Sequence, residues 1–221
     1  MTISYAIPVC NEIKEIELLL EFLIKNKQAE DEIVIVIDED NGTEEVKDYV
    51  EDFAHTYLDL ENIEVYYHSL NKDFATHKNF INLQCKGDYI FSVDADEMPD
   101  KMLMKYLPEI LESNDVDAIW IPRINIVNGI TPEHISKWGW NVNEDGWVNW
   151  PNDPQLRVYK NKPEIKWERK VHERLTGYKT ISRLPDEKEF ALWHIKEIDR
   201  QEKQNDLYDR IEANNRNKYK V

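Results

Sequence analysis

The stretch GDYIFSVDADE, residues 87–97, joins the pattern of a buried strand to a cluster of carboxylates. Small and apolar residues run from Tyr89 to Val93, and Asp94, Asp96 and Glu97 follow them directly. Like charges at this spacing repel each other, so a fold that keeps them needs a positive partner nearby. We therefore expect this stretch to end a core strand at a site that binds a cation.

The part of the chain before residue 97 alternates between strand patterns and helix patterns. Strands are predicted by the runs ISYAIPV at 3–9, EIVIVID at 32–38, IEVYYHSL at 63–70 and DYIFSVD at 88–94. Apolar residues at helical spacing lie between these runs, within 16–23, 46–57 and 74–85. After the fourth strand, Pro99 suits the first turn of another helix, with Asp100 at its positive end. This alternation predicts an α/β fold with a mainly parallel sheet and helices on both faces.

Polar residues follow each of these predicted strands. They are Asn11 and Glu12, then residues 38–40, 71–73 and 94–97. In a parallel sheet, ligands bind beyond the carboxyl ends of the strands. We therefore expect the four strand ends to converge on one acidic crevice.

The second half of the chain has a less regular pattern. The run AIWIPRINIVNGI, residues 118–130, predicts one long strand that ends in a turn at Asn128 and Gly129. The runs QLRVYKN and EIKWERKVHERL predict short strands, and the polar segment 197–221 predicts a surface helix with a thin apolar stripe. Four tryptophans lie in the Gly- and Asn-rich stretch between 138 and 150, where they could stack on sugars or fill a small core: Trp138, Trp140, Trp147 and Trp150.

Length and charge limit the classes of protein to which the chain can belong. Its 221 residues are enough for one domain, 1–221, with a single sizeable core. The formal net charge of −16 makes non-specific binding to nucleic acid an unsuitable role, so no nucleic-acid partner is expected. No apolar run approaches the ~20 residues of a membrane span, and the first residues lack a signal-peptide layout. We expect a cytoplasmic protein without a membrane span.

The pattern Asp-x-Asp at a strand end suits a hard divalent cation. Mg²⁺ and Mn²⁺ prefer oxygen ligands and keep waters and substrate phosphates in their coordination shell. One or two carboxylates beside a diphosphate would therefore suffice for a site at Asp94 and Asp96. The alternative is an exposed acidic turn, which the position after a buried strand makes less suitable.

Taken together, these motifs resemble a family 2 glycosyltransferase of the GT-A fold, close to small bacterial and phage-type members. The segments that carry the resemblance, in order along residues 3–195, are IPVCNE, VIVID, NKDFATHKNF, GDYIFSVDADE, DPQLRVYKN and KWERKVHERL. The resemblance implies a Rossmann-like three-layer α/β/α sandwich. It also implies a nucleotide-sugar-binding half at 1–97, an acceptor and catalytic half at 98–195, and a C-terminal helix at 196–221.

The resemblance also implies which residues bind the nucleotide sugar: Pro8, Val9, Asn11, Glu12, Asp38, Lys78, Asp94, Ala95 and Asp96. Of these, Asp38 would bond the base or ribose, Asp94 the ribose or sugar hydroxyls, and Asp96 the metal, Mn²⁺ or Mg²⁺. Lys78 stands where the family often has arginine, which replaces a planar fork by a single ammonium. Glu97 would orient the turn or a metal-bound water.

Two further roles each have two candidates. A histidine from the second half often completes the metal site in such enzymes, and His172 in KVHER is the first candidate, with His194 in FALWHIKE as its competitor. Inversion at the anomeric carbon needs a base for the acceptor's proton. The resemblance implies Asp153 for that role, where most relatives carry Glu-Asp and this chain has Asn-Asp, and Glu173 is the reserve candidate.

The activity implied is metal-dependent, inverting transfer of a sugar from a nucleoside-diphosphate sugar to a hydroxyl acceptor. A UDP-sugar is the favoured donor, and a glycan or lipid-linked saccharide is the kind of acceptor expected. The alternatives are another nucleotide-handling enzyme, such as a phosphatase or nucleotidyltransferase, and a non-catalytic protein that binds sugar nucleotides. A phosphatase with an aspartyl nucleophile usually carries Asp-x-Asp on its first strand, whereas here it follows the fourth.

Overall fold

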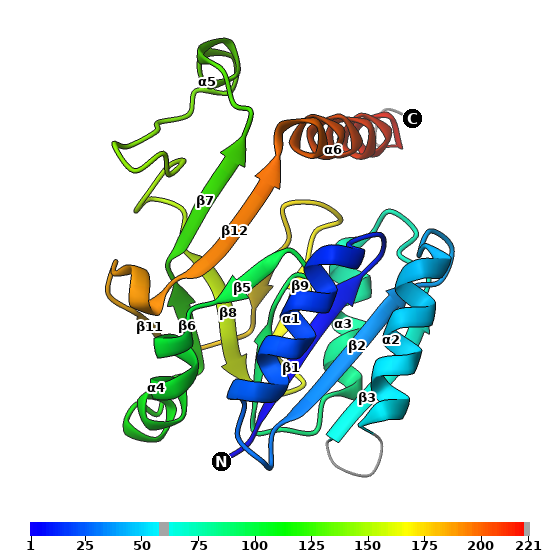
Figure 1. The fold of residues 1–221 in the computed structure, drawn as a ribbon, viewed down its shortest axis with the longest axis vertical. Helices are drawn as coiled ribbons and strands as arrows, with labels where there is room; N and C mark the ends of the chain where they lie inside the picture. Colours follow the sequence, from blue (N-terminus) through cyan, green and yellow to red (C-terminus); the bar gives the residue numbers. More distant parts are fainter. Residues whose placement is uncertain (58–61, 219–221) are drawn as a thin grey trace.

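A seven-stranded sheet forms the centre of the protein in the computed structural model, which describes residues 1–57 and 62–218. Its strands, in spatial order, are β11 (Ile181–Arg183), β6 (Ala118–Ile121), β8 (Gln155–Lys160), β4 (Tyr89–Ser92), β1 (Ile3–Val9), β2 (Glu32–Asp38) and β3 (Asn62–His68). Neighbours pair in parallel from β4 to β3, while β8 runs antiparallel to both of its neighbours. The predicted α/β fold with a mainly parallel sheet is confirmed (Figure 1).

Helices cover both faces of this sheet. One face carries α1 (Ile13–Asn26), α2 (Glu44–Thr56) and α4 (Lys101–Ser113). The other carries α3 (Phe74–Gln84) and the hairpin of β9 (Lys166–Glu168) and β10 (Arg174–Thr176). The helical stripe predicted within 16–23 is the buried face of α1, because Ile16, Leu19, Leu20 and Leu23 have no exposed surface. Each such side chain contributes roughly 1.5–3 kcal/mol by leaving water, which fixes α1 against the sheet.

A second sheet of three strands accompanies the central sheet. It has the order β5 (Glu97–Pro99), β12 (Leu192–Glu197) and β7 (Arg123–Asn128). The prediction of one continuous strand over 118–130 is wrong, because the chain leaves the central sheet at Pro122 between β6 and β7. Proline has no N–H for a ladder, but its carbonyl accepts a hydrogen bond from Leu192 N at 2.9 Å. This break aims β7 at the carboxyl edge of the central sheet.

The start of α4 also differs from its prediction. Pro99 lies in β5 and not in the first turn of the helix. Asp100 is the N-cap, and its Oδ1 accepts a hydrogen bond from Met102 N at 2.8 Å. The helix begins at Lys101 because this carboxylate satisfies one of the free N–H groups of the first turn.

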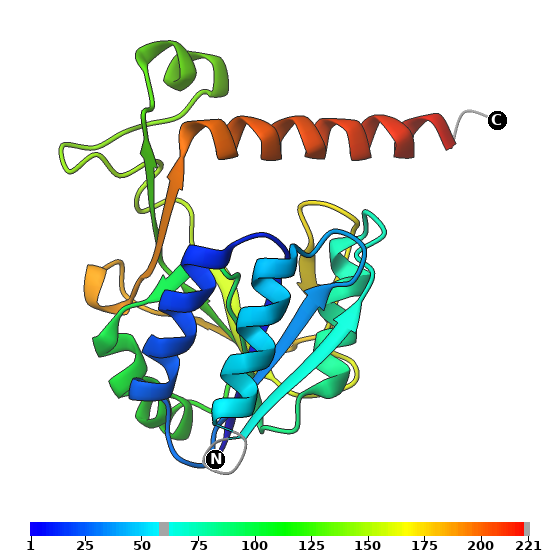
Figure 2. The same ribbon diagram turned by 45° about the vertical axis from the view of Figure 1, so that its right-hand side comes forward.

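The strands β7 and β12 carry two helices past the edge of the central sheet. These are α5 (Pro132–Trp138) and the long α6 (Ile198–Lys218), which runs across the top of Figure 2. A short 3-10 turn, η1 (Lys188–Phe190), precedes β12. The surface helix predicted over 197–221 is thus α6, whose last three predicted residues lie outside the described residues. None of the described helices combines the length and the apolar composition of a membrane span.

Gly177, directly after β10, offers a test of the packing of the β9–β10 hairpin. Its φ is +84°, and an added Cβ would lie 1.7 Å from the carbonyl oxygen of Glu164. We expect Gly177→Ala to lower the unfolding free energy by at least ~2–3 kcal/mol, because the backbone strain and the overlap add up. Denaturant unfolding measures the change.

Gly139, the C-cap of α5, is the matched control for this variant. Its φ is also positive, at +65°, but nothing lies within 4 Å of its added Cβ. Gly139→Ala should therefore cost only the backbone strain, about 1 kcal/mol. Equal losses in the two variants would contradict the tight contact at Glu164.

Candidate functional site

The carboxyl ends of β1, β2 and β4 lie at one edge of the sheet, as the sequence predicts. The side chain of Arg200, on α6, joins two of these ends, because it contacts Glu12 after β1 at 2.6 Å and Asp96 after β4 at 3.6 Å. At the end of β2, Asp38 accepts a hydrogen bond from Leu70 N at 3.1 Å. The third predicted set, 71–73, has a different role, since Asp73 caps the N-terminus of α3 by accepting a hydrogen bond from Thr76 N.

The turn after β1 is shaped by Glu12. Its Oε2 accepts hydrogen bonds from Cys10 N at 2.7 Å and Asn11 N at 2.9 Å, while Oε1 pairs with Arg200. The strand itself supplies Pro8 and the buried Val9, and Asn11 is exposed. A carboxylate therefore fixes this loop beside the edge of the sheet, and the exposed amide of Asn11 is accessible to a ligand.

Asp94 is held by two buried cations. Lys78 Nζ lies 3.1 Å from its Oδ1, and Arg157 contacts its Oδ2. Burial alone would raise the pKa of Asp94, but Arg157 and Lys78 outweigh that effect and hold its pKa below the ordinary value. Lys78 also lies 3.0 Å from Glu173, so one ammonium links the two carboxylates.

Glu97 is the buried centre of the turn, with no exposed side-chain surface. Its Oε1 lies 2.7 Å from Arg157 and 3.0 Å from Arg123, and its Oε2 accepts from Asp94 N at 3.3 Å. This contact orients the turn, in line with the role predicted for Glu97. Arg157 Nε is a buried nitrogen without a hydrogen-bond partner in the part of the chain that the structure describes. Buried donors are nearly always paired, so this position suits an acceptor oxygen from water or a ligand.

These contacts correct one expectation from the sequence. The acidic turn was predicted to need a bound cation to relieve repulsion among Asp94, Asp96 and Glu97. Instead, each of the three carboxylates contacts basic side chains of the protein itself. The positive partners are Lys78, Arg123, Arg157, Lys196 and Arg200.

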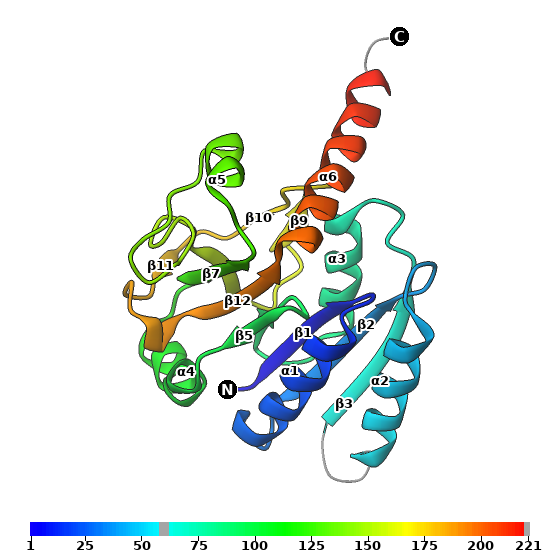
Figure 3. The ribbon, with the colours of Figure 1, turned by 45° about the horizontal axis from the view of Figure 1, so that its top comes forward.

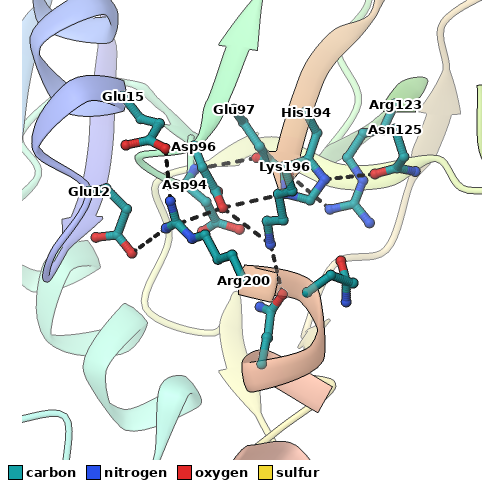
Figure 4. A network of polar contacts seen from close by, with 12 residues as sticks. Glu12, Glu15, Asp94, Asp96, Glu97, Arg123, Asn125, His194, Lys196 and Arg200 are labelled. Carbon is teal, nitrogen blue, oxygen red and sulfur yellow. Dashed lines mark hydrogen bonds and ion pairs between the residues drawn. The ribbon is translucent and has the colours of Figure 1, made fainter. Parts of the chain in front are cut away.

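Asp96 faces the C-terminal part of the chain (Figure 4). Its Oδ2 lies 3.5 Å from His194 Nε2, 3.2 Å from Lys196 Nζ and 3.6 Å from Arg200 Nη2. Burial alone would raise the pKa of Asp96, but these neighbours, His194 first, hold its pKa well below the ordinary value. Its side chain is 11% exposed, so little solvent separates these charges.

Of the two candidate histidines, the structure brings His194 to Asp96. His172 was the first candidate, but its side chain is 63% exposed and its Nε2 lies 3.6 Å from Glu212 on α6. Its ring also packs against Tyr208, with the centroids 5.2 Å apart. The reason is strand alternation: Leu192, His194 and Lys196 share the buried face of β12, which turns toward the acidic turn.

The hydrogen bonds of His194 indicate which of its ring nitrogens is free. Asn125 Nδ2 donates to Asp153 Oδ2 at 2.7 Å, so Asn125 Oδ1 faces the histidine, 2.7 Å from Nδ1. Nδ1 must then carry the proton and donate it, because that amide oxygen can only accept. Burial lowers the pKa of His194, which favours the neutral ring. In this neutral form, Nε2 carries a lone pair that a cation beside Asp96 can accept. When Nε2 is protonated, it donates to Asp96 Oδ2 instead.

This donor set fits a divalent cation. Two ligand atoms on one octahedral ion at ~2.1 Å lie about 3 Å apart, close to the 3.5 Å between Asp96 Oδ2 and His194 Nε2. A metal-binding histidine typically donates the N–H of its other ring nitrogen to a fixed oxygen. No group of three or more His, Cys, Asp or Glu side chains within 1–57 and 62–218 could hold a metal ion. The arrangement therefore suits a cation whose other ligands come from a bound diphosphate and water.

Asp153, the predicted base, lies on the same network. Arg123 donates to its Oδ2 from Nε at 3.1 Å and from Nη2 at 2.7 Å. Its other oxygen accepts from Gln155 Nε2 at 3.1 Å, and its side chain is 32% exposed. Asn125 therefore links it to His194, while the reserve candidate Glu173 pairs with Lys78 and is 14% exposed.

The tryptophans form two partly buried groups. Trp147 makes edge-on contacts with Trp150 and Trp193, with ring centroids 5.4 Å and 5.9 Å apart. Trp138 stacks on His134 and contacts Trp140 at the end of α5. Trp150 precedes Asp153 by three residues and Trp193 adjoins His194, so the first group lies along the chain beside the predicted site.

Sequence reasoning missed several basic residues of the site. The exposed basic residues of the second half include Lys137, Lys166, Arg169, Lys170 and Arg174, whereas Arg157 is only 4% exposed. The sequence carries a signal for it, because an arginine between the apolar Leu156 and Val158 of a buried strand needs a carboxylate partner. Arg123, Lys196 and Arg200 carry no such local signal, because none of them stands between two apolar residues of one buried strand.

The amino-acid sequence matches a known protein family and parts of individual relatives. The model described as Glycosyl transferase family 2 matches residues 4–190 of the chain. The chain is 24% identical over 126 residues to "Probable glycosyltransferase YdaM" of Bacillus subtilis, which covers 57% of this chain and 30% of that protein. It is 36% identical over 67 residues to "Lipopolysaccharide core biosynthesis glycosyltransferase LpsC" of Rhizobium meliloti, which covers 29% and 25%. The chain thus spans less than a third of the length of these two relatives in the matched parts.

Solved structures show the same fold. TarS 1-349 of S. aureus in complex with UDP-GlcNAc is similar with a TM-score of 0.63 and 20% identity, over 89% of this chain and 59% of that one. The same protein in complex with UDP has a TM-score of 0.62 and 20% identity, over 88% and 60%. At these identities the similarity is evidence of the fold.

Arg157 is the residue whose removal tests the buried network. Replacing it by methionine leaves Asp94 and Glu97 without their shared cation, and we expect a loss of about 3–5 kcal/mol in unfolding free energy near neutral pH. The matched control is Arg183→Met, since Arg183 is exposed and pairs with Asp186 on the surface, where the loss should stay below about 1 kcal/mol.

Arg157→Met should also change how the unfolding free energy depends on pH. Because the pKa of Asp94 is depressed in the folded protein, the unfolded chain binds more protons below about pH 4, and wild-type stability falls there. Without Arg157 that depression is weakened, so the difference in stability between variant and wild type should be constant from about pH 7 to about pH 5 and should shrink as the pH falls below about 4. A difference that stays constant between about pH 5 and about pH 2, in denaturant titrations at both values, would argue against the pairing.

Proposed function

The chain belongs to glycosyl transferase family 2 and has the GT-A fold, and from this premise we propose that it transfers a sugar from a nucleoside-diphosphate sugar to a hydroxyl acceptor. The resemblance drawn from the sequence is thereby confirmed at the level of the family. The observation that carries the proposal is the cluster of Asp94, Asp96 and Glu12 with fixed basic partners at the carboxyl edge of a parallel sheet. In such sheets that edge is the site of nucleotide binding.

The proposed donor is a UDP-sugar. TarS, which has a similar fold, is seen in complex with UDP-GlcNAc, and this supports UDP as the first nucleotide to test. The strand β1 and its turn supply Pro8, Val9, Asn11 and Glu12 to the nucleoside side, and Asp38 of β2 is the candidate for the base or ribose. Asp94, Ala95 and Asp96 form the sugar and diphosphate side, with Lys78 as the fixed cation beneath Asp94.

The proposed cofactor is Mn²⁺ or Mg²⁺, held by Asp96 and His194. His194 takes the role first given to His172, because its free Nε2 lies 3.5 Å from Asp96 Oδ2 whereas His172 contacts α6. When bound, the cation neutralises the negative charge that grows on the departing diphosphate.

Asp153 is the proposed base, and the transfer inverts the anomeric carbon. The acceptor oxygen forms its bond to that carbon as the bond from the carbon to the diphosphate oxygen breaks, and the acceptor's proton passes to Asp153. Arg123 and Asn125 fix Oδ2 of Asp153, which holds the carboxylate in one orientation for this step. Glu173 is the alternative base.

The proposed acceptor is a saccharide, either free or lipid-linked. Trp147, Trp150 and Trp193 provide indole faces of the kind on which sugar rings stack, in the segments that carry Asp153 and His194. LpsC, which matches part of the chain, carries a name that refers to lipopolysaccharide core biosynthesis, and this supports testing glycan acceptors.

A thermal-shift panel tests the donor and the cofactor together. Melting is measured with UDP, GDP, ADP or CDP, each with and without Mn²⁺. We expect one diphosphate to stabilise the protein by about 2.7 kcal/mol at 100 times its Kd, and more strongly with Mn²⁺. Asp96→Asn should keep the nucleotide effect and lose the added effect of Mn²⁺. A melting temperature that no diphosphate moves, even with saturating Mn²⁺, would count against the proposal.

Substitution of the base separates the two candidates. Once the panel has identified the donor, Asp153→Asn should lower transfer to a saccharide acceptor by about 10²–10⁴-fold while donor binding is retained. Glu173→Gln is the competing variant, and Asp145→Asn is the control, because Asp145 is exposed in the preceding loop. Full transfer by Asp153→Asn together with a loss in Glu173→Gln would assign the base to Glu173.

A further inference from the structure

The segment from β12 into α6 brings two cations onto the acidic edge of the sheet. Lys196 Nζ lies 3.2 Å from Asp96 Oδ2, and its side chain is 6% exposed. Arg200 contacts Glu12 at 2.6 Å, Glu15 at 3.0 Å and Asp96 at 3.6 Å, as the dashed lines in Figure 4 trace. Both cations thus contact Asp96 of the proposed donor site, and Arg200 also contacts Glu12 of that site.

We propose that Lys196 and Arg200 bind the diphosphate of the donor, which makes the end of β12 and the start of α6 part of the nucleotide site. This inference rests on the proposed function. The charge balance at this point supports such a role. Three carboxylates, Glu12, Glu15 and Asp96, would repel an incoming diphosphate, and these two side chains are the cations in contact with them.

Lys196 and Arg200 differ in how firmly they are held and in the geometry of their hydrogen-bond donors. Lys196 is held in place, because its ammonium also donates to Gln204 Oε1 of α6 at 2.7 Å. Arg200 is 31% exposed, so its guanidinium can turn from the carboxylates toward a ligand. A guanidinium presents its donors as a planar fork that matches two phosphate oxygens, whereas an ammonium acts as a point charge.

Contacts further along α6 hold the helix over the same edge. Tyr208 packs against Phe74 of α3, with ring centroids 5.7 Å apart, and against His172. Ile211 is 3% exposed. Figure 3 gives the matching view, in which the first turns of α6 follow the end of β12 and lie beside α3. The position of Arg200 is therefore set by packing on both sides of it.

A rival interpretation is that Arg200 only latches α6 onto an empty site. The two interpretations predict opposite changes in the affinity for UDP when the cations are removed. If the cations bind the diphosphate, their removal weakens binding of UDP and leaves binding of uridine unchanged. If they only hold the helix down, their removal opens the site and strengthens binding of both ligands.

The test is calorimetric titration of the full chain with UDP and with uridine, in buffers with Mn²⁺ and with a chelator. Arg200→Met and Lys196→Met remove one charge each, and Lys203→Met is the control, a lysine on the same helix that is exposed. We expect each of the two variants to bind UDP roughly 10- to 100-fold more weakly, with uridine affinity within about twofold of wild type. Lys203→Met should match wild type for both ligands.

Arg200→Lys is a conservative variant that tests the inference even if Arg200→Met fails to fold. It keeps the charge and loses the fork, so its loss of UDP affinity should be smaller than that of Arg200→Met. Variants that keep the wild-type preference for UDP over uridine, or that bind UDP more tightly, would overturn the inference and leave the proposed function intact. A wild-type protein that binds none of UDP, GDP, ADP or CDP would overturn the proposed function, and this inference with it. If the bound base is not uracil, the matching nucleoside and diphosphate replace uridine and UDP.

Discussion

The pairing of Arg157 with Glu97 and Asp94 is the interaction on which the rest of the site depends. Glu97 has no exposed side-chain surface and Arg157 has almost none, so both charges have lost their water. Burial of an ion costs several kcal/mol, which only close partners and full hydrogen bonding can offset. The acidic turn can therefore hold one geometry only while β8 delivers Arg157 and β7 delivers Arg123. Because β8 is the antiparallel strand beside β4, the sheet order itself makes this pairing possible.

The two ends of the acidic turn have different partners around this fixed centre. The Asp94 end is rigid, because Lys78 and Arg157 hold both of its oxygens from beneath. The Asp96 end faces His194 and the C-terminal segment, where the partners come from β12 and α6. A rigid end suits sugar hydroxyls, which need fixed hydrogen-bond partners. The Asp96 end includes the partly exposed Arg200, and it suits the diphosphate of the proposed donor.

Asn125 connects the two chemical roles that the site must combine. Its amide lies between His194 and Asp153, so the orientation of the proposed metal ligand and that of the proposed base are set by one side chain. Arg123 strengthens this link, since it contacts both Asp153 and the buried Glu97. A shift of the strand β7 would therefore move the base relative to the acidic turn. The strand holds that position because the chain turns out of the central sheet at Pro122.

The amino-acid sequence by itself determined the layers of the fold and the strand ends at which the site lies. Period and composition are local properties, so EIVIVID predicts a buried strand and GDYIFSVDADE predicts acids at the end of another without knowledge of the rest. Only the tertiary structure decided which basic side chains pair with those carboxylates. It also decided that His194 lies beside Asp96 while His172 does not. The reason is distance along the chain: Arg157 and Glu97 are 60 residues apart, and Arg200 and Glu12 are 188 apart. Such pairs leave no periodic trace in the sequence, because they form only after strands and helices have packed and water has been excluded between them.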